Sequence, residues 1–131
     1  VASRKDDACA ATQAHLEAMG GEALGVPTHM GEIAALSALV ERTVERFGRI
    51  DVVVNNAATA LAQTIGQITP EAWDKSYTVN LRGPVFLVQA ALPHLEASPC
   101  ASVINVISVG ALMFSPFVGL YAGVRGDPAR G

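Results

Sequence analysis

Two short runs of β-branched residues constrain the fold of this chain more than any other feature. The runs IDVVVNNAA, residues 50–58, and SVINVIS, residues 102–108, are apolar at consecutive rather than alternate positions. A strand with one face in water alternates apolar and polar side chains, whereas a strand of a parallel sheet covered on both faces does not. Both runs therefore predict buried strands of a parallel sheet.

Helical periodicity surrounds these strands. Three segments have apolar residues at every third or fourth position: 6–19, 32–47 and 70–95. They predict amphipathic helices, and Thr69 and Pro70 are typical of an N-cap and a first helical residue. Residues 22–29 are a weaker strand candidate. We therefore predict one partial domain over residues 1–131, an α/β fold with a doubly wound, Rossmann-like parallel sheet.

Composition argues against several classes of partner. Half of the 131 residues are hydrophobic, and the net charge of −3 comes with no basic block. We therefore expect neither a nucleic-acid partner nor an anionic-membrane partner. Residues 97–124 carry no charge, but Pro116 and several polar residues favour a strand, a loop and a helix start over a membrane span.

The two cysteines indicate a cellular compartment rather than a site. Cys9 and Cys100 lie far apart, and no histidine stands near them at ligand spacing. Neither a metal site nor a disulfide is expected, and two buried, reduced cysteines in a cytoplasmic protein are the prediction.

The first residue is Val1, with no signal-like segment, so we expect the chain to begin inside a longer product or to have been trimmed.

Polar residues follow both predicted strands, where open parallel sheets bind their ligands. Asn55 and Asn56 end the first run, and Ala57 and Ala58 are small enough to let a flat ligand approach the backbone. Ser108 ends the second run. Each also has an ordinary structural role available, because Asn can end a strand and a Ser hydroxyl can satisfy a backbone group. Singly, these residues leave a binding site and a structural role both open.

The order and spacing of these residues are more specific than any one of them. NNAA is followed by Asn80 in VNLRG, then by Ser108, then by Tyr121 with Arg125 four residues later. This series resembles the short-chain dehydrogenase/reductase family up to about Tyr121, whereas residues 122–131 form a divergent tail. The resemblance implies an NAD(P)-dependent oxidoreductase that transfers a hydride between nicotinamide and a ketone or secondary alcohol.

The resemblance assigns catalytic roles to four positions. Asn80 matches the Asn of the family's catalytic tetrad, Ser108 the Ser that hydrogen-bonds the substrate carbonyl, and Tyr121 the general acid/base. Negative charge builds on the carbonyl oxygen during hydride transfer, so a proton donor must stand beside it, and a neighbouring cation favours the phenolate. Arg125 stands where the family has Lys, and the only two lysines lie elsewhere in the sequence.

The resemblance also implies cofactor contacts. Asn55, Asn56 and Ala57 match the NNAG motif beside the adenosine part of the cofactor, with Ala58 in place of its glycine. His29 stands where the family has an adenine-contacting Asp.

Ser3 and Arg4, at the end of a short N-terminal strand, predict NADP rather than NAD. NAD-selective members usually carry an acidic residue at the matching Ser position to bind the ribose 2′-hydroxyl, and a carboxylate would repel a 2′-phosphate. The guanidinium of Arg4 would instead pair with that phosphate. A solvated arginine on a loop is the alternative.

Substrate and oligomeric state follow from weaker signals. Four residues between Ser108 and Tyr121 predict a small carbonyl or alcohol substrate with an apolar face: Leu112, Met113, Phe114 and Phe117. The alternative is that they only cover the sheet or a subunit contact.

The helix over 70–95 resembles one through which family members pair, so a homo-oligomer is expected for the intact parent.

Departures from the family predict that this chain alone is inactive. The glycine-rich TGxxxGxG turn that holds the pyrophosphate is absent, and so is the strand before it. In the family that strand lies between those ending at VAS and at DVVVNN, so a gap in the middle of the sheet is expected. Arg125 replaces Lys, and GDPARG cannot continue the Tyr helix. A non-catalytic fragment that acts only in binding or association is the alternative.

A proline adds a local prediction at Asn80. Pro84 lacks the N–H that would bond to the Asn80 carbonyl in a regular α-helix, so a kink and a free carbonyl are expected. A free carbonyl there can hold a water, as in the family, and an ordinary proline kink is the alternative.

Overall fold

The computed structural model describes residues 1–111 and Leu120. The predictions made for Tyr121, Arg125 and the apolar residues 112–114 and 117 therefore lie outside the described residues. In the part described, four short strands alternate with helices in the order β1 (Ala2–Ser3), α1 (Asp6–Ala18), β2 (Val26–Pro27), α2 (Ile33–Phe47), β3 (Val52–Asn55), α3 (Pro70–Tyr77), a π-helix (Thr78–Arg82), α4 (Gly83–Glu96), β4 (Ser102–Asn105) and a 3₁₀ turn (Val109–Ala111).

The predicted helices form, and their ends have identifiable causes. Gly48 follows α2 with φ of 76°, in the left-handed region where glycine ends helices readily. The Thr69 hydroxyl accepts the N–H of Ala72, and Pro70 opens α3, which confirms the predicted cap.

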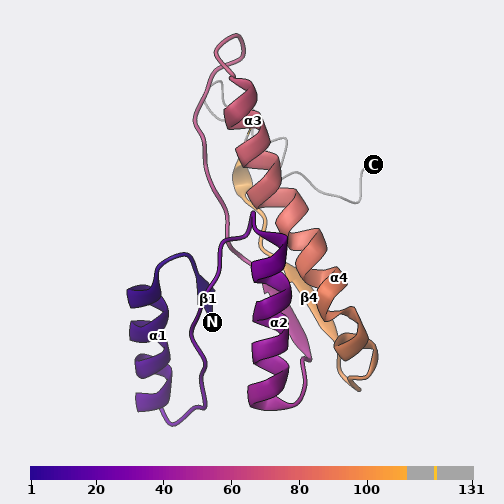
Figure 1. Cartoon of the computed structure of the whole chain (residues 1–131). Coiled ribbons are helices and arrows are strands. Elements are labelled where there is room, and N and C mark those ends of the chain that lie inside the picture. Colours follow the sequence, from indigo (N-terminus) through magenta and orange to yellow (C-terminus); the bar gives the residue numbers. More distant parts are fainter. Residues whose placement is uncertain (112–119, 121–131) are drawn as a thin grey trace.

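The long helix is irregular just before Pro84, where a kink is predicted, and the irregular turn is a π-helix. The N–H of Gly83 bonds to the carbonyl of Thr78, five residues back, so one turn is widened between α3 and α4. Figure 1 shows α3 continuing through this turn into α4 as one rod. The water predicted on the Asn80 carbonyl stays a prediction.

The strands form two separate parallel pairs. β1 pairs with β2, with Ala2 opposite Val26, and β3 pairs with β4 from Val52 opposite Ser102 to Asn55 opposite Asn105. No described strand joins the two pairs, so the predicted gap in the sheet is confirmed. In Figure 1, α1 and β1 lie on one side of α2, and α4 and β4 lie on the other. The architecture is a partial Rossmann-like α/β fold, as predicted.

Burial of the two long strands differs from the prediction. Val53 is 8% exposed, but Val52 and Val54 are 49% and 53% exposed, and every residue of β4 is exposed. The expectation that both faces are covered is therefore wrong for this chain. The reason is that α2 and α4 pack on one face only, around a core of Val40, Ile50, Val53, Ala91 and Leu95. No described element covers the other face.

The cysteines and the apolar segments give two further results. Cys9 is buried on α1 and Cys100 is exposed in the turn before β4, and both are free thiols. The prediction of two buried cysteines is therefore wrong for Cys100, because that turn lies outside the α2–α4 core. No helix in the described part of the chain is long and apolar enough to cross a membrane.

A close backbone approach connects the turn after β2 with the end of the π-helix. A Cβ atom placed on Gly83 would overlap the carbonyl oxygen of Met30, in the turn between β2 and α2. Next to it, Nη2 of Arg82 donates to the carbonyl of Gly31 at 3.1 Å. Only glycine permits this approach, which brings the carboxyl end of β2 against the π-helix.

Candidate functional site

A cavity of about 660 Å³ opens at the carboxyl ends of β1, β2 and β3. All seven residues predicted to contact a cofactor line it: Ser3, Arg4, His29, Asn55, Asn56, Ala57 and Ala58. They come together because the carboxyl ends of parallel strands meet at one edge of a sheet. Their role as cofactor contacts stays a prediction.

Asn55 supplies a buried polar group at the cavity wall. The side chain is 5% exposed, and its Nδ2 donates to Oδ1 of Asn105 on the neighbouring strand at 2.9 Å. Its own Oδ1 is buried with no hydrogen-bond partner among the described residues. Such an orphan acceptor costs free energy, so Asn55 can accept a hydrogen bond from a group entering the cavity.

The ends of β1 and β2 contribute donors. Ser3 ends β1, and Arg4 follows it with an exposed side chain that no ion pair engages within the described residues. His29 is exposed, and its Nδ1 accepts the N–H of Gly31 at 3.0 Å. In the neutral ring the proton is therefore on Nε2. At this position the chain offers a donor where a carboxylate would offer an acceptor.

Asn80 holds the loop that follows β3. The side chain is 5% exposed in the π-helix, its Oδ1 accepts the N–H of Thr59 at 2.8 Å, and its Nδ2 donates to the Thr59 carbonyl at 2.9 Å. The same Nδ2 lies 3.3 Å from the Ser76 hydroxyl. Both functional groups of this side chain are therefore engaged. Asn80 acts here as a positioning residue that fixes the end of the NNAA segment.

The structure does not bring Asn80 and Ser108 into the lining of the cavity. Ser108 is half-buried beyond β4, and its hydroxyl accepts the N–H of Gly110 at 3.2 Å. That contact is the ordinary structural role that the sequence left open for it. Its role toward a substrate stays a prediction, as do the roles of Tyr121 and Arg125.

Sequence reasoning missed a helical wall of the cavity. Lys75 of α3 and Val79 of the π-helix line it together with Thr59. Lys75 and Val79 are four residues apart, so they share one face of a helix. This spacing next to Asn80 is the feature of the sequence from which the helical wall could have been predicted. Lys75 adds a second cation to the cavity that contains Arg4.

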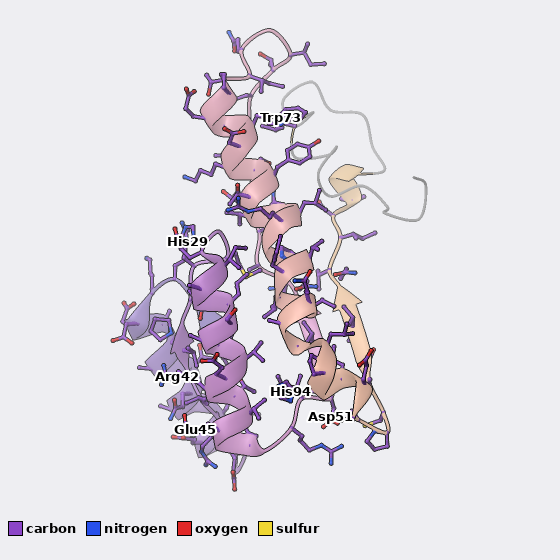
Figure 2. All side chains as sticks on the ribbon, turned by 45° about the vertical axis from the view of Figure 1, so that its right-hand side comes forward. His29, Arg42, Glu45, Asp51, Trp73 and His94 are labelled. Atoms are coloured by element: carbon purple, nitrogen blue, oxygen red, sulfur yellow. The ribbon has the colours of Figure 1, made fainter. Side chains whose placement is uncertain are left out.

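A cluster of charged and polar side chains lies at the opposite end of the strands. Arg49 donates to Oδ1 of Asp51 from Nε at 3.1 Å and Nη2 at 2.6 Å, and the Ser98 hydroxyl donates to the same atom. The hydrogen bond from Arg49, followed by that from Ser98, holds the pKa of Asp51 below its usual value. Figure 2 shows Asp51 and His94 far from His29, so this cluster anchors the α4–β4 turn and not the cavity.

Comparison with known proteins identifies the family. The short chain dehydrogenase family model matches residues 1–125. An uncharacterized oxidoreductase of Methylorubrum extorquens is 34% identical over 125 residues, which are 95% of this chain and 49% of that protein. Human dehydrogenase/reductase SDR family member 4 is 32% identical over 88% of this chain and 42% of its own length. The chain belongs to the short-chain dehydrogenase/reductase family.

Solved structures agree with this assignment. A gluconate 5-dehydrogenase from Burkholderia cenocepacia in complex with NADP and tartrate has a TM-score of 0.86 and 26% identity, over 95% of this chain and 49% of that one. A short-chain dehydrogenase/reductase from Burkholderia phymatum in complex with NAD has a TM-score of 0.88 and 28% identity, over 95% of this chain and 44% of that one. The chain spans about half the length of the relatives it matches.

The reciprocal hydrogen bonds of Asn80 generate the first prediction. Asn80→Ala leaves the N–H and carbonyl of the half-buried Thr59 without these partners, so we expect the free energy of unfolding in urea to fall by about 1–2 kcal/mol. Hydrogen exchange at the Thr59 amide should accelerate in the same variant. Gln89→Ala, at an exposed position of α4, is the control, with an expected change within about 0.5 kcal/mol. Unchanged exchange at Thr59 in Asn80→Ala would contradict the positioning role.

Proposed function

We propose that this chain carries the cofactor-side half of an NADP-dependent oxidoreductase. The reaction is hydride transfer between the nicotinamide and a ketone or secondary alcohol with an apolar face. The parent protein is cytoplasmic and forms a homo-oligomer. One observation carries the proposal: the seven strand-end residues predicted to contact a dinucleotide line a single cavity. Family membership supports the reaction class, and structural neighbours in complex with NADP or NAD support the cofactor class.

The donor set of the cavity fits the adenosine end of NADP. Arg4 offers a planar guanidinium suited to bidentate contact with a phosphate, and Ser3 offers a hydroxyl beside it. Ala57 and Ala58 leave the backbone accessible to a flat ring, and the orphan Oδ1 of Asn55 can accept a hydrogen bond. NADP, when bound, supplies the hydride, and these residues bind and orient its adenosine half.

The cavity offers fewer groups that could bind the pyrophosphate of the cofactor. No glycine-rich turn lines the cavity in the described part of the chain. The first turn of α1, which follows β1 and Arg4, carries Asp6 and Asp7, whose negative charges oppose an anion at that helix end. We therefore expect weak cofactor binding by the 131-residue chain.

Catalytic roles complete the proposal. Asn80 positions the loop beside the cofactor, Ser108 bonds the substrate carbonyl, and Tyr121 moves the proton. Arg125 supplies positive charge near Tyr121 in place of a lysine, but a planar guanidinium does not replace a compact ammonium at a ribose hydroxyl. Weak cofactor binding and this replacement both lower the rate.

Discrimination by the 2′-phosphate is the second prediction. In low salt, adenosine 2′,5′-bisphosphate should bind the chain about tenfold more tightly than adenosine 5′-monophosphate, because only the former offers a 2′-phosphate to Arg4. Arg4→Ala should abolish the difference in isothermal titration. Arg42→Ala, an exposed arginine on α2 outside the cavity lining, should preserve it. Equal affinity of the wild-type chain for the two nucleotides would overturn the NADP preference.

Absence of turnover by the chain alone is the third prediction. With NADPH and a panel of ketones, from small keto acids to bulky apolar ketones, the purified 131-residue protein should show no absorbance change above the uncatalysed rate. A mismatch of one unit in the pKa of the general acid lowers the rate about tenfold. Weak cofactor binding lowers it further. Turnover that disappears in Tyr121→Phe would show this prediction to be wrong.

A further inference from the structure

The imidazole of His29 is held by the turn between β2 and α2. Its Nδ1 accepts the N–H of Gly31 at 3.0 Å. A Cβ atom on Gly31 would lie 3.1 Å from both Nδ1 and Cε1 of the ring, so the glycine leaves room for this close contact. The carbonyl of Gly31 in turn accepts Nη2 of Arg82. The backbone that holds the ring is therefore itself attached to the π-helix.

This contact leaves His29 with one polar group for a ligand. Because Nδ1 receives an N–H, the proton of the neutral ring is on Nε2. No hydrogen bond engages Nε2 among the residues that the structure describes. His29 is exposed and lines the cavity, and Figure 2 shows it at the amino-terminal end of α2. It therefore offers a ligand one donor and no acceptor.

His29 lies where the base of the proposed nucleotide can be read. β1 and β2 are paired and parallel, so Arg4 and His29 leave the sheet at the same edge. The proposed function places the 2′-phosphate on Arg4 and a flat ring over Ala57 and Ala58. His29 lines the same cavity. The edge of that flat ring is the part of the nucleotide left for its donor.

Purine bases differ at the edge that such a donor meets. Hypoxanthine and guanine have two neighbouring acceptors there, O6 and N7, whereas adenine has its 6-amino group, a donor, beside N7. Side chains that only donate read the O6 and N7 pair, and side chains that both donate and accept read adenine. A neutral imidazole whose Nδ1 is already occupied belongs to the first kind.

We propose that His29 is a specificity-determining residue that favours 6-oxopurine nucleotides over adenine nucleotides in this cavity. Its Nε2–H donates to O6 of hypoxanthine or guanine. Adenine offers the same donor only a ring nitrogen, with the amino group alongside, so NADP still fits but without the stronger contact. The inference rests on the proposed function, because it needs a nucleotide in the cavity, but it concerns the base and not the 2′-phosphate.

Two nucleotides that differ at position 6 test the selection. In low salt, inosine 5′-monophosphate should bind the 131-residue chain about three- to tenfold more tightly than adenosine 5′-monophosphate in isothermal titration. The third probe is 6-thioinosine 5′-monophosphate, which keeps the N–H groups of inosine but has a weaker acceptor at position 6. It should bind more weakly than inosine 5′-monophosphate.

A pair of histidine variants separates base reading from general effects on the fold. His29→Phe keeps an aromatic ring and removes both nitrogens, so the affinity ratio of the inosine and adenosine nucleotides should fall to about one. His15→Phe, at an exposed position of α1 outside the cavity lining, should preserve the ratio. Circular dichroism should show the same helical content in both variants.

The outcomes distinguish this inference from the function on which it rests. Equal affinity of the wild-type chain for the two monophosphates, a preference for adenosine, or a preference for inosine that persists in His29→Phe would overturn the base selection. Each of these results would leave the nucleotide site itself intact. If neither monophosphate binds and adenosine 2′,5′-bisphosphate does not bind either, the proposed function is wrong and the base selection is wrong with it.

Discussion

The approach of Gly83 to the carbonyl of Met30 is the contact on which the rest of the structure depends. The first strand pair and the second share no backbone hydrogen bonds in the described residues, so their relative placement comes from other contacts. Gly83 and the bond from Arg82 to the Gly31 carbonyl hold the turn after β2 against the π-helix. Together with the packing of α2 on α4, this joint sets the carboxyl ends of both pairs around one cavity. A side chain at position 83 would force them apart.

The same π-helix controls a second wall of the cavity. Asn80 makes two reciprocal hydrogen bonds with the backbone of Thr59. The segment from Asn55 to Thr59 therefore leaves β3 in a fixed direction. Asn80 lies in the π-helix and is buried, and single-turn π-helices occur often at functional sites. The adenosine site that we propose therefore rests on a helix that itself supplies Lys75 and Val79 to the cavity.

Much of this arrangement could be predicted from the sequence, for physical reasons that also explain what was missed. Helices α1 and α2 follow from apolar periodicity, and the clustering of Arg4, His29 and Asn55 follows from the common edge of parallel strands. Exposure of Val52 and Val54 could not be predicted, because burial depends on which elements cover a face and not on the strand's own residues. The bond between Asn80 and Thr59 joins residues 21 positions apart, and it depends on a helical register that propensities do not set.

The most direct test of this account is hydrogen exchange in Gly83→Ala. If the joint positions both strand pairs, the amides of Thr28 and Gly31, which bond to Ser3 and His29, should exchange faster, while amides of the α2–α4 core keep their protection. Gln89→Ala on the same helix is the matched control. Unchanged exchange at Thr28 and Gly31 in Gly83→Ala would contradict the account, because the α2–α4 core alone would then be enough to hold the turn after β2 in place.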